Sequence, residues 1–241
     1  MGPLNMSMSL MVLQTGALVR KLEQFDEPVT SCVWTADSQS LITGTLDQER
    51  SICQWDLEGN HIHTWTKKHR TASLDLSPDE HWLVAMDDQQ WLHVYNFRTR
   101  ELEYEWDLKS TPTSVSISHD SRFLLVNKAD GEGLLIDIET RDMVQKYRGQ
   151  SGGEYMIRSG FGGANESFVI SGSEGKAGFV VEATWEDADM ILDGNVLIWH
   201  KSTGIPIQKL EAHHPRCNAV SWNPVDPCMF ATCGDDAKIK M

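Results

Sequence analysis

The side chains with the clearest potential for chemistry are His213, His214 and Cys217, near the end of the chain. Histidine and cysteine are the usual zinc ligands, and a structural zinc site combines two ligand pairs at defined spacings. The sequence offers no second pair nearby, so the spacing favours a structural role for His213. We therefore expect neither a metal ion nor another cofactor.

Motifs that support catalysis on other folds do not occur in the sequence. It contains no Gly-x-Ser-x-Gly turn, no His-Glu-x-x-His helix and no phosphate-binding loop. The glycine-rich stretch 160–163 has no helical pattern after it, and we interpret it as a loop between strands. His61 and His63 alternate along one predicted strand, which favours a solvated strand face. The sequence predicts a protein that is not an enzyme.

Composition narrows the class of protein further. The 241 residues include 35 acidic and 21 basic side chains, a formal net charge of −14. An acidic chain is poorly suited to neutralise phosphates, so we expect no nucleic-acid partner. The apolar runs are too short to span a bilayer, which predicts no membrane partner. Five scattered cysteines without CxxC spacing indicate reduced thiols, and hence the cytoplasm, with the nucleus as a second location.

The elements that would position these residues recur along the chain. An apolar strand, a polar turn and two further strands follow each of Val29, Thr71 and Pro112, and two less regular copies come later. The polar turn recurs at residues 37, 79, 120, 165 and 226, with spacings of 42, 41, 45 and 61. A period in the low forties built from short strands is typical of WD repeats. The sequence therefore predicts an all-β fold, a WD40-type β-propeller.

We expect one propeller domain over residues 1–241, with a partial blade at 1–28 and repeats at about 29–70, 71–111, 112–154, 155–216 and 217–241. The last repeat is truncated. At about 40 residues per blade, a seven-blade ring is longer than this chain. The expectation is therefore about five blades of such a ring.

Residues 175–192 interrupt the fourth repeat. Removing these 18 residues restores the regular spacing and joins Glu174 directly to Asp193, in an acidic hairpin turn. The segment resembles no other repeat, and codons for its two ends can supply splice signals. We interpret it as a retained short intron, with a true insertion on the propeller rim as the alternative.

The repeats resemble the WD-repeat family, in which a His, a Ser or Thr, an Asp and a Trp form a buried hydrogen-bonded tetrad in each well-formed blade. Such a network stabilises a blade when every member is paired. The resemblance implies partial tetrads in three blades, while the middle blades lack most members. The implied residues are Thr43, Asp47 and Trp55; Ser171, Asp193 and Trp199; and His213, Thr232 and Asp236.

Nine tryptophans need separate interpretation. Trp34, Trp55, Trp199 and Trp222 lie on apolar strand positions and are predicted core residues. Trp82, Trp91 and Trp106 lie beside charged residues; packing is the favoured interpretation for them, and a partner-binding patch is the alternative. The basic cluster 67–70 is interpreted as a solvated loop between blades.

From Gln145 to Asn223 the sequence is more specific. The stretches QKYRG at 145–149, YMIRS at 155–159, FGGANESF at 161–168, DGNVLIWHK at 193–201 and NAVSWNP at 218–224 resemble the WD-repeat subunit of the GID/CTLH ubiquitin ligase. The resemblance implies a non-catalytic scaffold that recruits substrates or assembles a multi-subunit ligase. Its partners would be the other ligase subunits and protein substrates. Members join the ligase through LisH and CTLH helical segments, which this sequence does not contain.

Two alternatives remain open from the sequence. One is a WD-repeat adaptor in transcription or RNA processing. The other is a propeller hydrolase with carboxylates around a central channel. The residues expected to face that channel include Val115, Ser116 and Ala219, and they do not supply the paired acids that hydrolysis requires.

Overall fold

The computed structural model describes residues 6–11, 14–153, 155–174 and 194–241 of the chain. Apart from one short 3-10 helix at Ala164–Glu166, the regular elements of this part are β-strands. The chain divides into two compact units, Met1–Lys109 and Ser110–Met241, where the sequence predicted one domain. Each unit is described by itself.

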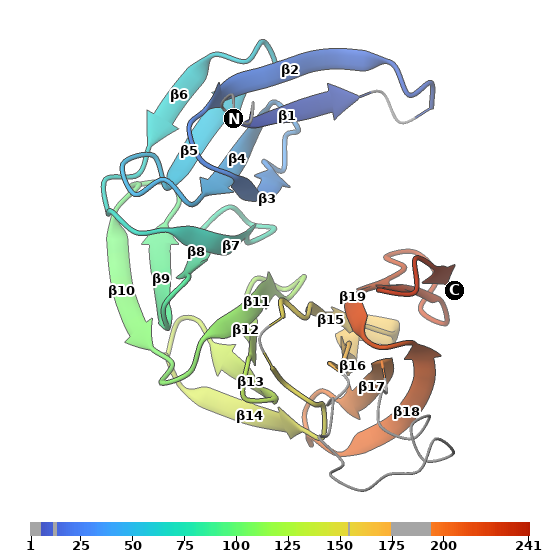
Figure 1. The fold of residues 1–241 in the computed structure, drawn as a ribbon. Coiled ribbons are helices and arrows are strands. Elements are labelled where there is room, and N and C mark those ends of the chain that lie inside the picture. The colour runs from blue at the N-terminus through green and yellow to red at the C-terminus, as the bar shows by residue number, and fades with distance from the viewer. Residues whose placement is uncertain (1–5, 12–13, 154, 175–193) are drawn as a thin grey trace, which may run out of the picture. The chain divides into compact units, whose positions relative to one another are not determined.

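The first unit contains a two-stranded sheet and two four-stranded sheets (Figure 1). In each of them the strands follow one another in chain order with antiparallel pairing, as in a propeller blade. The sheets are β1 (Met6–Met11) and β2 (Leu18–Phe25); β3 (Val29–Trp34), β4 (Ser40–Thr45), β5 (Ile52–Asp56) and β6 (His61–Thr64); and β7 (Thr71–Leu76), β8 (Trp82–Asp87), β9 (Trp91–Asn96) and β10 (Leu102–Asp107).

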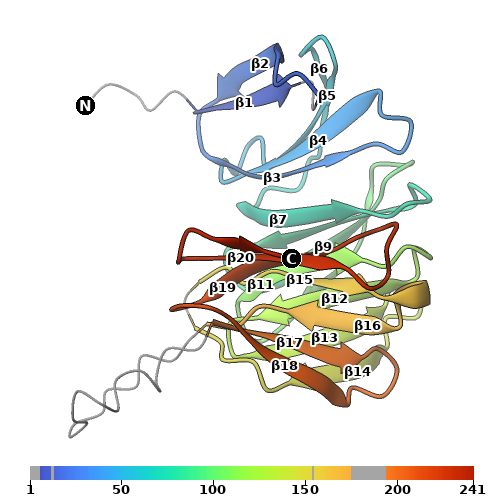
Figure 2. The same cartoon turned by 90° about the vertical axis from the view of Figure 1, so that its right-hand side faces the viewer.

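The second unit has two four-stranded sheets and one three-stranded sheet, again with neighbouring strands in chain order (Figure 2). This strand order confirms the predicted all-β, WD40-type fold class. The sheets are β11 (Pro112–Ile117), β12 (Phe123–Lys128), β13 (Glu132–Asp137) and β14 (Met143–Arg148); β15 (Ser159–Gly162), β16 (Phe168–Ser171), β17 (Gly194–His200) and β18 (Pro206–His213); and β19 (Cys217–Trp222), β20 (Phe230–Gly234) and β21 (Ile239–Lys240).

The second and third strands of the four-stranded sheets carry the core. In β4, β8, β12 and β16, nearly every residue is buried, because both faces of these strands are covered. One core cluster of the first unit joins Ile42 and Ile52 of one sheet to Leu74 and Leu83 of the next. Apolar contact between successive sheets therefore holds the blades of this unit together.

The turn between the first two strands repeats in three sheets. The hydroxyl groups of Thr35 and Ser77 donate to the carboxylates of Asp37 and Asp79, at 2.7 and 2.6 Å, and Ser118 does the same with Asp120. These are three of the five polar-turn residues that the sequence singled out. Their regular spacing therefore comes from a turn in which an aspartate accepts a local hydrogen bond.

The turn between the third and fourth strands ends in a left-handed residue. Arg100, Arg141 and Gly204 have φ values of 65°, 64° and 67°. Each donates its N–H to the carbonyl four residues earlier, at 2.8 to 2.9 Å. Glycine adopts this conformation without strain and arginine does not.

We expect Arg100→Gly and Arg141→Gly each to raise the free energy of unfolding by about 0.5–1 kcal/mol, because glycine relieves the left-handed strain. Urea unfolding followed by tryptophan fluorescence measures the effect. Thr99→Gly is the matched control, since Thr99 has a negative φ, and it should lower the free energy instead. Equal effects of Arg100→Gly and Thr99→Gly would contradict the explanation.

Two sequence predictions about packing are wrong. The glycine-rich stretch 160–163 is mostly strand β15, not a loop. A Cβ added at Gly162 would lie 2.0 Å from the Trp222 ring, so glycine here permits close contact with β19. Trp34, a predicted core residue, is 52% exposed. Trp34 is the last residue of β3, which lies at the edge of its sheet. It therefore has a paired residue, Leu41 of β4, on one side of the strand.

The predicted insertion 175–192 lies outside the described residues. Its flanking strands β16 and β17 pair directly, with Ser171 opposite Leu197. The corresponding connections are residues 88–90 between β8 and β9 and 129–131 between β12 and β13, against 172–193 here. The extra residues therefore lie within one hairpin connection of a blade.

Candidate functional site

In the sheet β3–β6, the structure brings two of the three implied tetrad residues together. The indole Nε1 of Trp55 donates to the hydroxyl of Thr43 at 2.9 Å, and both side chains are fully buried. Asp47 accepts a hydrogen bond from the backbone N–H of Glu49 at 2.9 Å, within its own turn. The Thr43–Trp55 bond thus fixes the third strand against the second, while Asp47 shapes the hairpin.

The last three implied residues form one hydrogen-bonded group, although His213 ends β18 and Thr232 lies on β20 of the next sheet. His213 contacts Asp236 through Nδ1 at 2.8 Å and Thr232 through Nε2 at 2.9 Å. Burial raises the pKa of Asp236, but the hydrogen bonds from His213 and from the Lys238 N–H outweigh it and lower the pKa below its usual value. Both ring nitrogens of His213 are therefore engaged in protein contacts.

Cys217, the cysteine nearest to His213 in the sequence, is buried, and its thiol contacts the Ala219 carbonyl at 3.7 Å. Burial first, and then the nearby Cys233, raise the pKa of the Cys217 thiol to about 12. Among the described residues, no group of three His, Cys, Asp or Glu side chains is placed to hold a metal ion.

In the sheet β15–β18, the implied residues Ser171 and Trp199 are not hydrogen-bonded to each other. Trp199 donates its indole N–H to the Arg148 carbonyl of the preceding sheet at 3.0 Å, and not to Ser171. Ser171 donates to its neighbour's carbonyl, Gly172 O, at 2.9 Å and accepts from Asn127 at 3.3 Å. The third implied residue, Asp193, lies outside the described residues. Trp199 thus joins two blades instead of closing a network within one.

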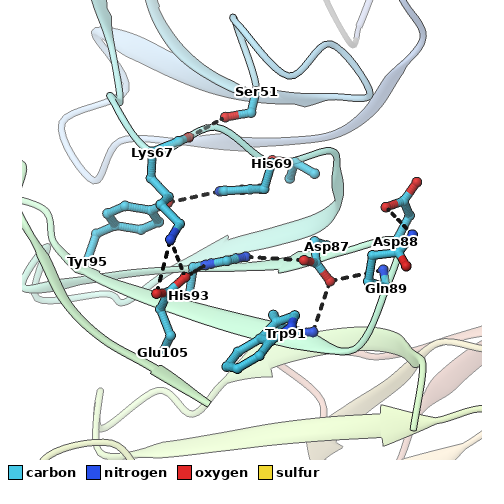
Figure 3. Close-up of polar contacts among 11 residues, drawn as sticks. Ser51, Lys67, His69, Asp87, Asp88, Gln89, Trp91, His93, Tyr95 and Glu105 are labelled. Atoms are coloured by element: carbon cyan, nitrogen blue, oxygen red, sulfur yellow. Dashed lines mark hydrogen bonds and ion pairs between the residues drawn. The ribbon is translucent and has the colours of Figure 1, made fainter. Parts of the chain in front are cut away.

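A further polar network lies in the sheet β7–β10, which the sequence did not single out (Figure 3). His69 hydrogen-bonds through Nε2 to the Tyr95 hydroxyl at 2.9 Å and through Nδ1 to Thr71 at 3.2 Å. Its ring stacks on that of His93, with centroids 4.0 Å apart and an interplanar angle of 8°. His69 is buried, so its predicted place in a solvated loop is wrong.

The second histidine of this network lies between two carboxylates. His93 Nδ1 is 2.8 Å from Glu105, and its Nε2 is 3.5 Å from Asp87. The ammonium group of Lys67 pairs with Glu105 at 2.9 Å. Burial raises the pKa of Asp87, but hydrogen bonds from His93 and the Trp91 and Gln89 N–H groups hold it below the usual value.

Tyr95 takes the place in this sheet that Trp55 has in its own. Trp55 lies opposite Leu41 across its ladder, and Tyr95 lies opposite Leu83 at the matching position. In the sheet β7–β10, the residue that corresponds to Thr43 is Ala85, and Ala85 lies opposite His93. This sheet therefore has Ala85 and Tyr95 at the positions of the Thr and the Trp, with His93 opposite Ala85, and Tyr95 at a strand-end landmark was the signal available in the sequence.

The other predictions about tryptophan and histidine burial have different outcomes. Trp55 and Trp199 are fully buried as predicted, and Trp222 is partly buried against Phe230, with ring centroids 5.2 Å apart. Trp82 and Trp106 are partly buried, and Trp91 is 40% exposed. His61 is exposed, whereas His63 packs edge-on against Trp65 at 4.9 Å.

These networks contain acids, bases and hydroxyls, but most of their polar atoms contact one another in the protein interior. His69 and His93 are at most 7% exposed, so a substrate would have little access to either ring. The arrangement stabilises strands and supplies no presented nucleophile. No helix in the described part of the chain is long and apolar enough to cross a membrane.

The WD40 family, described as "WD domain, G-beta repeat", matches residues 16–56 and 204–241. Two relatives carry names that describe repeats alone. "WD repeat-containing protein WDS homolog" of Arabidopsis thaliana is 33% identical over 216 residues, 88% of this chain and 38% of that protein. "WD repeat-containing protein 26 homolog" of the same plant is 32% identical over 232 residues, 95% of this chain and 36% of that protein.

A third relative has a name that refers to a complex. "GID complex subunit 7" of Schizosaccharomyces pombe is 31% identical over 220 residues, which are 88% of this chain and 39% of that protein. The chain spans about two-fifths of the length of these relatives. The similarity therefore covers most of this chain and a minor part of each relative.

Proposed function

Because the chain belongs to the WD-repeat proteins and is homologous to GID complex subunit 7 and to WD repeat-containing protein 26 homologues, we propose that it is a protein-interaction subunit of a GID/CTLH-type ubiquitin ligase. In this role it recruits substrates or assembles subunits for ubiquitin-dependent degradation, in the cytoplasm and the nucleus. The observation that carries the proposal is the 31% identity to a GID complex subunit over 88% of the chain.

The structure supports a scaffold by the way its polar groups are used. His69 and His213 are buried; His69 is hydrogen-bonded to residues of the sheet β7–β10, and His213 links the end of β18 to the sheet β19–β21. Stiff blades with varied loops are a common platform for binding other proteins. Binding without turnover is the role that such an arrangement serves best.

Affinity purification of the tagged full chain from cells, followed by mass spectrometry, tests the proposal. We expect RING-type and CTLH-type ligase subunits to be enriched over a matched purification with an unrelated WD-repeat bait. The unrelated bait controls for general stickiness of propeller blades. Recovery of transcription or RNA-processing complexes in place of ligase subunits would replace the proposal with the adaptor alternative. Recovery of neither would leave the fold intact and reject the ligase.

A further inference from the structure

A small polar pocket lies in the second unit, between the turn that joins β12 to β13 and residues 150–153, Tyr155 and Ile157. It encloses about 190 Å³ of free space, part of it open to solvent, and the enclosed part has room for a group about the size of one water molecule. Asn127, Lys128, Gln150 and Tyr155 are among the residues that line it. The pocket therefore suits the end of a thin side chain rather than a ring.

Gln150 presents an unsatisfied acceptor at this pocket. Asn127 Nδ2 donates to the Ile157 carbonyl at 3.2 Å and to Ser171 at 3.3 Å, so Asn127 Oδ1 faces Gln150. Gln150 Nε2 donates to Asn127 Oδ1 at 2.7 Å, which fixes the orientation of the Gln150 amide. Its Oε1 is buried and has no hydrogen-bond partner among the described residues, and the residue is 9% exposed. Buried acceptors normally find a donor, so this position calls for one.

The charges around the pocket permit a cationic donor. Lys128 is already paired with Asp130 at 2.9 Å and Glu132 at 3.2 Å, so its charge is offset. The carboxylate of Glu174 accepts the Tyr155 N–H at 3.3 Å, and it lies so close to Gly153 that a Cβ there would be 2.2 Å from it. Glu174 does not line the pocket, but its carboxylate lies against two residues that do, Gly153 and Tyr155.

The mouth of the pocket carries exposed apolar surface. Tyr155 is 50% exposed and Met156 is 47% exposed. The Arg216 guanidinium lies over the Tyr155 ring, 3.4 Å from its centroid, and pairs with Asp235 at 2.9 Å, which holds the ring in place. Tyrosine, methionine and arginine are enriched where proteins bind other proteins.

We propose that this pocket binds a lysine side chain of a partner protein, with the ammonium group donating to Gln150 Oε1 and the aliphatic stem lying on Tyr155 and Met156. A lysine matches the site because it combines a small donor with a long apolar stem. The inference rests on the proposed protein-binding role and specifies what is recognised. Its test uses the isolated chain, so its failure is distinct from a failure to recover ligase subunits.

Nuclear magnetic resonance titration of the full chain tests the inference with the peptide Ac-Gly-Lys-Gly-NH2, read at the Gln150 side-chain amide and the Tyr155 ring. Three peptides serve as comparisons. Two of them carry acetyl-lysine or arginine in place of the middle lysine, and the third is Gly-Gly-Gly-NH2 with a free terminal amine. We expect shifts with lysine and a loss of affinity of at least about tenfold with acetyl-lysine, which lacks the charged donor. A stronger response to the terminal amine than to lysine would reassign the site to chain termini and overturn the lysine assignment.

Two variants separate recognition from structure. Gln150→Met removes the acceptor and should weaken lysine binding at least about tenfold, while Gln145→Met, a glutamine outside the pocket, should not. Glu174→Gln keeps the shape, removes the charge and should weaken binding by a smaller factor, which preserves the test if Gln150→Met folds poorly. Equal responses to lysine and acetyl-lysine, unchanged affinity in both pocket variants, or no shift at all would show that the pocket holds water only and would overturn the inference.

Discussion

Replacement of Trp199 by alanine is expected to lower the free energy of unfolding by about 3–5 kcal/mol. The side chain is fully buried and packs against Tyr147, with ring centroids 5.9 Å apart. Its indole N–H also donates to the Arg148 carbonyl at 3.0 Å, so the substitution leaves a cavity and removes a hydrogen bond between two sheets. Both effects act at the contact between two blades of the second unit. Urea unfolding followed by circular dichroism measures the loss.

Trp91→Ala is the matched control for this prediction. Trp91 is the first residue of β9 and is 40% exposed, so removing its ring leaves a much smaller cavity. We expect a change within about 1 kcal/mol. If both variants lost the same free energy, the explanation from burial and blade contact would be contradicted.

The His69 network should make the stability of the first unit depend on pH. Burial first, and then the neighbouring His93, lower the pKa of His69 from 6.5 to about 3. Between these values the unfolded chain takes up a proton that the folded chain does not, so the free energy of unfolding falls as pH falls from about 6.5 toward 3. Each unit of pH in this window removes up to about 1.4 kcal/mol through this one group.

We expect His69→Gln to flatten this dependence, because glutamine can still hydrogen-bond to Tyr95 and does not titrate. Between pH 7 and pH 5 the unsubstituted chain should lose about 1–2 kcal/mol more than the variant, as measured by urea unfolding at each pH. His61→Gln removes an exposed histidine of the same unit and should keep the full slope. A His69→Gln variant with the unchanged slope would show that the network does not exclude the proton.

The repeat pattern predicted the sheets because each polar turn leaves a local signature in the sequence. Thr35 and Ser77 donate to aspartates two residues later, so the landmark is contained in three residues. The first strands of three sheets begin at Val29, Thr71 and Pro112, which are the residues where the apolar pattern resumes. Features fixed by neighbours in sequence were therefore accessible to prediction.

Features that depend on contacts between residues far apart in the sequence could not be predicted from the sequence. Trp199 bonds to Arg148, 51 residues away, and no local pattern distinguishes this from a bond to Ser171. His69 was assigned to solvent because it lies in a basic run, whereas Tyr95 and His93 bury it. The glycines of β15 belong to a strand that pairs with β16, and Gly162 lies against the ring of Trp222. In each case the deciding partner lies far along the chain.

The role proposed for this chain is to bind subunits of a ubiquitin ligase. Size-exclusion chromatography of the purified full chain, mixed with purified RING-type and CTLH-type subunits, tests it most directly. We expect a stable complex that elutes earlier than any component and contains the chain in fixed proportion. Elution of the folded chain at its own position, separate from every subunit, would contradict it.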